Sequence, residues 1–277
     1  MRNTFMKSGI LLLSMAMGAM ICRGQDLLQS ELKPVLEEGK KIFQVEMAGR
    51  IAEKWFKPKY NGQDKLSGWV AYPDGDGMRV TFYTSRDKNP VLASVMVNKS
   101  MEDSTLQGEW NARALLPVED ELIQARKAAV KVCEDSAAFP LPEGTRFVFI
   151  PLKGDAEDMV YILTEPVSRH EVVFGNDFML RFDSKKNLSA KMPLHKNMSS
   201  IPFDPDAGNA NNSNSSHTMI PAAGDLVTST DIAVLLLNQS QTHWSHHSFI
   251  SENYIFFWNY QSGQMMAIAK GAPKTEK

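Results

Sequence analysis

The residues of this sequence that could do chemistry gather between positions 215 and 258, which hold four of the six histidines. His217 comes first, and Asp231 follows in a Thr-x-x-Asp step that begins at Thr228. Three further histidines lie close together: His243, His246 and His247. Imidazole and carboxylate are zinc ligands, and a catalytic zinc needs three protein ligands with one position open for water. The spacing therefore indicates a candidate metal centre.

This region resembles the JAB/MPN family of zinc-dependent isopeptidases over roughly residues 117–260. In that family an H-x-H step and an S-x-x-D step hold the zinc, and an upstream glutamate acts as base on the bound water. Here His217 matches the first histidine, Asp231 matches the aspartate, and Thr228 stands in the serine position. Met219 occupies the place of the second histidine, and a thioether is a poor zinc ligand. The resemblance thus implies a related scaffold with a degenerate metal site.

The same residues have plainer interpretations. Thr228 and Asp231 form a capping-box pattern before an apolar run, which predicts a helix start. His217, beside a Ser/Asn-rich stretch, is typical of a solvated loop residue. The histidine cluster can lead into an edge strand with Trp244 packed on the core, and would then change charge near pH 6–7. Alternatively, one histidine of the cluster completes a zinc site with His217 and Asp231.

The other candidate residues add no second site. Neither Glu165 nor Glu171 lies in a context that matches the family's base, and His170 and His195 stand at strand ends without identifiable partners. The sequence has no nucleophile-elbow, phosphate-loop or dinucleotide motif.

The N-terminus predicts export. A basic start precedes the apolar run 9–21, which is short of the roughly 20 residues that a spanning helix needs. A signal peptide over residues 1–24, cleaved before Gln25 or Asp26, places the mature chain in the periplasm or outside the cell, without a transmembrane helix. Lipid anchoring at Cys22 is the alternative.

Composition fits an exported globular protein. Removal of the signal peptide leaves Cys133 as the last cysteine, so the mature chain has no internal disulfide and depends on its core. Cys133 lies on the apolar side of an expected helix and is predicted to be buried. The net charge is −2, with no basic patch, which argues against a nucleic-acid partner.

Periodicity predicts an α+β protein of two mixed units, each a largely antiparallel sheet with packed helices. Residues 26–116 form the first unit, and residues 117–270 form the second, JAB/MPN-like unit with a polar loop at 202–216. The expected helices are 26–57, 117–138 and 226–238. The expected strands are 66–72, 78–84, 91–98, 106–116, 146–152, 159–164, 171–174, 178–182, 188–194, 247–250 and 254–260.

Three functional hypotheses follow. The first is a non-catalytic exported protein that binds an unknown ligand, protein or envelope partner without a cofactor. The second is a zinc-dependent peptidase or isopeptidase with His217, Asp231 and a histidine of the cluster as ligands. The third is a component of a surface assembly that docks through the N-terminal helix.

Overall fold

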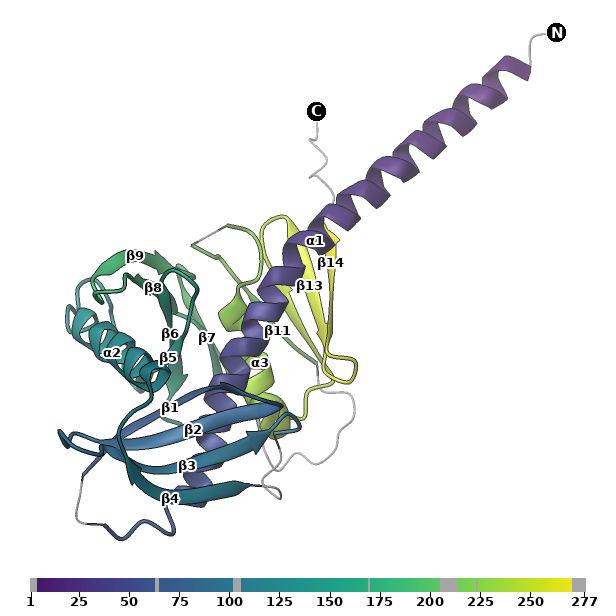
Figure 1. Cartoon of the computed structure of the whole chain (residues 1–277). Helices are drawn as coiled ribbons and strands as arrows, with labels where there is room; N and C mark the ends of the chain where they lie inside the picture. Colours follow the sequence, from purple (N-terminus) through teal and green to yellow (C-terminus); the bar gives the residue numbers. More distant parts are fainter. Residues whose placement is uncertain are drawn as a thin grey trace.

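The computed structural model of the 277-residue chain describes residues 4–62, 65–101, 106–168, 170–204, 214–222 and 224–270. The fold is α+β, as predicted, with helices packed on mostly antiparallel sheets (Figure 1).

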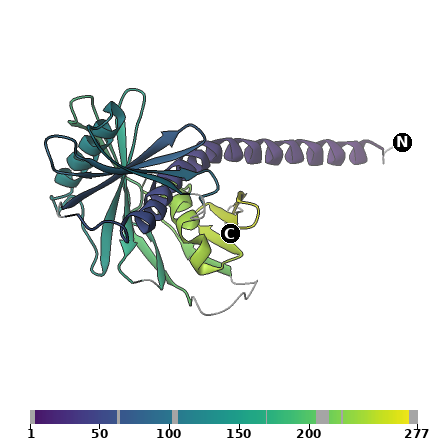
Figure 2. The same ribbon diagram turned by 60° about the horizontal axis from the view of Figure 1, so that its bottom comes forward.

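Helix α1, Thr4–Phe56, passes through the body of the molecule, and its N-terminal half projects away from it (Figure 1 and Figure 2). From Leu28 onward its apolar side chains are buried at helical spacing against the first sheet and helix α3. The apolar face of this helix therefore packs against the rest of the same chain. Pro34 lies in the helix interior.

The predicted signal peptide falls on the part of α1 whose side chains lie outside the described residues, so its cleavage stays a prediction. Within the described part of the chain, no helix has both the length and the apolarity needed to cross a membrane.

The first sheet is a four-stranded antiparallel meander that covers one side of α1. Its strands in spatial order are β1 (Leu66–Asp74), β2 (Gly77–Thr84), β3 (Val91–Asn98) and β4 (Gln107–Arg113). The predicted strands 66–72 and 78–84 are joined by an Asp-Gly hairpin: Asp74 pairs with Gly77, and Gly75 has a φ of 56°, which glycine adopts at little cost. Phe56 of α1 stacks on Phe82 with a centroid distance of 4.1 Å.

A second antiparallel sheet packs against helix α2, Pro117–Val132. Its strands in spatial order are β5 (Thr145–Leu152), β6 (Asp158–Pro166), β8 (Phe178–Phe182) and β9 (Leu188–Pro193). Helix α2 ends at Val132, several residues before the predicted end at 138.

The C-terminal part combines a two-stranded sheet, a helix and a four-stranded sheet. The two-stranded sheet pairs β7 (Glu171–Gly175) with β10 (Met198–Pro202). Helix α3 (Ser229–Thr242) packs on α1, where a Cβ on Gly39 would lie 2.5 Å from the Ile232 Cβ. The last sheet runs in the order β11 (Asn214–Thr218), β12 (His246–Ile250), β13 (Tyr254–Asn259) and β14 (Gln264–Ala269), with β11 parallel to β12.

Three details differ from the sequence-based predictions. Strands β7 and β8 do not pair with each other, because the chain turns at Gly175, whose φ is 97°, and β7 enters a different sheet. Residues 214–216 belong to β11 rather than to the predicted polar loop, whose middle, 205–213, lies outside the described residues. Strands β10 and β14 were not predicted at all.

One large apolar core joins the parts. It contains buried side chains from α1, the first sheet, β5–β7, α3 and the last sheet. The predicted units 26–116 and 117–270 therefore share packing, and the boundary between them stays a prediction.

Candidate functional site

The start of α3 has the geometry that the sequence predicts. Thr228 is the N-cap, and its Oγ1 accepts a hydrogen bond from the Asp231 backbone N–H at 3.3 Å. In return, Asp231 Oδ2 accepts from the Thr228 backbone N–H at 2.8 Å and from its hydroxyl at 3.0 Å. Both residues are buried, so these bonds satisfy groups that water cannot reach.

Asp231 also belongs to a buried charge cluster that the sequence did not reveal. His195 Nε2 lies 3.0 Å from Asp231 Oδ1 and 3.2 Å from its Oδ2. The other ring nitrogen, Nδ1, lies 3.6 Å from Asp177 Oδ2. Asp177 Oδ1 accepts a hydrogen bond from the Thr164 backbone N–H at 2.9 Å. A single imidazole thus connects the start of α3 with the β7–β8 connection.

The pKa values in this cluster follow from burial and from the closeness of the charges. Burial alone would lower the pKa of His195, but the charge and hydrogen bond of Asp231, with the charge of Asp177, raise it to about 9. Burial would raise the pKa of Asp231, yet His195 holds it below its usual value. Burial dominates at Asp177 and raises its pKa to about 7. His195 is therefore a buried imidazolium at neutral pH.

A second pair of histidines lies in the same region, where β11 runs beside β12. His247 Nε2 lies 3.0 Å from His217 Nδ1, and His247 Nδ1 lies 2.6 Å from the Ser215 hydroxyl. The Phe174 ring stacks on both imidazoles, with centroid distances of 4.6 Å to His217 and 4.9 Å to His247. Trp244 stacks on His247 as well, at 5.4 Å.

Burial keeps both of these imidazoles neutral. It lowers the pKa of His217 to about 4, and burial with the nearby charge of His217 lowers the pKa of His247 to about 3. The prediction of a charge change near pH 6–7 is therefore wrong for His247, because its ring is fully buried among aromatic side chains rather than exposed on an edge strand.

The five predicted metal ligands do not meet at one point. His217 and His247 are in contact, and Asp231 is near enough to raise the pKa of His217. His246 is exposed on β12, where its ring nitrogens contact Ser245 and Asn259. His243 is exposed at the C-terminal end of α3. Among the described residues, no group of three or more His, Cys, Asp or Glu side chains is arranged to hold a metal ion.

The residues present do not fit the zinc that the family resemblance implies. Asp231 Oδ2 already accepts from Thr228 and His195, Asp231 Oδ1 lies 3.0 Å from the His195 ring in an ion pair, and His217 Nδ1 faces His247. Met219, at the place of the third ligand, is a buried apolar side chain. A ligating carboxylate or imidazole would first have to give up these internal bonds.

The glutamates upstream also have structural partners. Glu165 forms ion pairs with Arg50 of α1 and, at 3.0 Å, with Arg146 of β5. Glu171 accepts a hydrogen bond from the Ser200 hydroxyl. Cys133 is half-buried, less than predicted, and burial raises the pKa of its thiol to about 11, which leaves it protonated.

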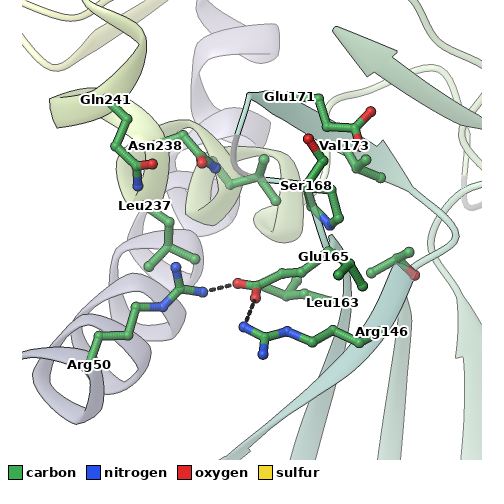
Figure 3. A pocket seen from close by; sticks show the side chains of 14 residues that line it. Arg50, Arg146, Leu163, Glu165, Ser168, Glu171, Val173, Leu237, Asn238 and Gln241 are labelled. Carbon is green, nitrogen blue, oxygen red and sulfur yellow. Dashed lines mark hydrogen bonds and ion pairs between the residues drawn. The ribbon is translucent and has the colours of Figure 1, made fainter. Parts of the chain in front are cut away.

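A cavity of about 480 Å³ lies where α1, α3 and the β6–β7 connection meet (Figure 3). Its charged lining residues are Arg50, Arg146, Glu165 and Glu171, and Asn238 and Gln241 of α3 add two carboxamides. Its apolar lining comes from buried or partly buried residues of β6, β7 and α3, which are Leu163, Pro166, Val173, Val234 and Leu237, and from the exposed Val167 of the β6–β7 connection. The volume and the mixture of apolar walls with a few polar groups are typical of small-ligand pockets.

Comparison of the chain with protein-family models, with curated proteins and with solved structures gives no match.

Proposed function

We propose that this chain is an exported binding protein, and that its C-terminal unit is a JAB/MPN-like scaffold that works without zinc. The strongest support is that the atoms which would bind zinc already form hydrogen bonds and ion pairs within the fold. Asp231 is committed to a helix cap and an imidazolium, and His217 is committed to His247. Such bonds stabilise a fold, whereas a catalytic zinc requires ligands with free lone pairs and an open position.

The cavity between α1 and α3 supports the binding part of the proposal. It is separate from the histidine cluster, since none of the clustered histidines lines it. Its polar groups are placed by α1, α3 and the second sheet, so the packed core holds the pocket in shape. Export follows from the N-terminal sequence and remains part of the proposal.

The test is to measure zinc content and peptidase activity together. Purified mature protein is dialysed against zinc, analysed for metal, and assayed on a mixture of peptides and an isopeptide-linked substrate. The proposal expects no stoichiometric zinc and no cleavage. One zinc per chain that disappears in both Asp231→Asn and His217→Gln, together with cleavage, would instead establish the zinc-dependent hydrolase. His170→Gln, at an exposed histidine, is the matched control.

A further inference from the structure

Four charged residues line the α1–α3 cavity: Arg50, Arg146, Glu165 and Glu171. Glu171 accepts from the Ser200 hydroxyl, and the other three form a chain of alternating sign that continues to Glu46 outside the cavity. Glu46 Oε1 lies 2.9 Å from Arg50 Nε, Arg50 pairs with Glu165 Oε1, and Glu165 Oε2 lies 3.0 Å from Arg146 Nη2. Glu46 and Glu165 are the more buried members, with 7% and 15% of their side chains exposed. Arg146 is the last residue of this series of ion pairs, and 67% of its side chain is exposed.

Arg146 can therefore pair with an anionic group of a ligand. A guanidinium has several N–H donors in a planar fork that suits a carboxylate, and the contact with Glu165 uses one of its terminal nitrogens. Figure 3 shows Arg146 reaching toward Glu165 at the cavity. A carboxylate at the mouth could pair with Arg146 while Glu165 keeps its bond to Arg50.

Other residues that line the cavity offer hydrogen-bonding and apolar groups for the rest of a peptide. Asn238 Nδ2 donates to the Val234 carbonyl at 2.9 Å, which fixes the carboxamide and leaves Oδ1 as an acceptor for a ligand N–H. Gln241, one turn further along α3, adds an exposed carboxamide. Between these polar groups, Val173 and Leu237 give an apolar surface for a side chain.

We infer that this cavity binds the C-terminal end of a peptide whose last residue is apolar. The terminal carboxylate pairs with Arg146, the last side chain contacts Val173 and Leu237, and a backbone N–H donates to Asn238 Oδ1. The inference rests on the proposed function, since it names the ligand class of a protein that binds without cleaving. A cavity of about 480 Å³ has room for only the last residues of such a peptide.

The experiment uses the tripeptide Gly-Ala-Leu as the free acid, its C-terminal amide, and octanoate, each titrated into the mature protein by calorimetry. The free acid is expected to bind at least about tenfold more tightly than the amide, since one charge-assisted hydrogen bond is lost. Arg146→Gln should weaken the free acid by a similar factor. Arg181→Gln, at an exposed arginine of β8 outside the cavity, should bind as the wild type does.

Several outcomes would overturn the inference: no binding of the free acid at millimolar concentration, equal binding of acid and amide, equal effects of the two arginine variants, or octanoate binding as tightly as the peptide. Thermal melts of both variants check the fold, and Arg146 is exposed enough for its replacement to be tolerated. Mass spectrometry of the recovered peptide separates the two proposals. A cleaved peptide refutes the non-catalytic function, whereas an intact peptide that does not bind refutes only this inference.

Discussion

Replacing His195 by glutamine removes the cation that lies between two buried carboxylates. The His195 ring lies 3.0 Å from Asp231 and 3.6 Å from Asp177, with only 3% of its side chain exposed. Glutamine can still donate one N–H to Asp231 but carries no charge. The variant should therefore fold less stably, because buried carboxylates are left without a compensating cation.

The pKa of His195 sets the size and the pH dependence of the effect. It rises from 6.5 to about 9 on folding. A difference of about 2.5 pH units, at about 1.4 kcal/mol each, corresponds to roughly 3 kcal/mol of unfolding free energy. Since the folded pKa is the higher one, this stabilisation is complete below pH 6.5 and is lost as the pH rises through 9. In the variant, Asp177, whose pKa is raised to about 7, can take up a proton below that pH, which reduces the cost of the missing cation.

Urea unfolding at pH 6, 8 and 9.5 tests this reasoning. The gap in unfolding free energy between wild type and His195→Gln should be about 3 kcal/mol at pH 6 and should shrink toward zero at pH 9.5. His170→Gln, at an exposed histidine, should match the wild type throughout. A gap that stays constant across these pH values would refute the buried imidazolium.

Three further predictions concern the cap, the neutral histidines and export. Thr228→Ala should lower the unfolding free energy by about 1 kcal/mol through loss of the N-cap, with Thr228→Ser close to wild type in thermal melts. Because folding lowers the pKa values of His217 and His247, stability should be complete above pH 6.5 and fall as the pH drops toward 3; His247→Phe should make this acid loss shallower in urea unfolding, and an unchanged profile would count against it. N-terminal sequencing of the exported protein should begin at Gln25 or Asp26, and an intact first methionine or a lipidated cysteine would contradict the signal peptide.

Local patterns were enough to predict the helices and most of the strands. The stripe of α1, the Asp-Gly hairpin at Gly75 and the cap at Thr228 each depend on residues within a few positions of one another. Such short-range signals are fixed by backbone geometry and by helical or strand periodicity. They also gave the α+β class, because the helices and most of the strands lie where the periodicity placed them.

The histidine–aspartate cluster could not be predicted in the same way. His195, Asp177 and Asp231 are separated by 18 and 36 residues along the chain, and only the three-dimensional fold brings them together. Asp177 follows a turn at Gly175, after which the chain enters β8 in a different sheet from β7. A histidine and two aspartates without characteristic spacing give no sequence signal that distinguishes a buried ionic cluster from exposed residues.

The most direct test of the account is the protonation state of the histidines, with and without zinc. Long-range proton–nitrogen NMR spectra of ¹⁵N-histidine-labelled protein at pH 7 report each ring, and His195→Gln and His247→Phe assign the signals. The account predicts a doubly protonated His195, neutral His217 and His247, and no change when one equivalent of zinc is added. Zinc-induced shifts at His217 and His247, with loss of the proton that His195 shares with Asp231, would contradict it.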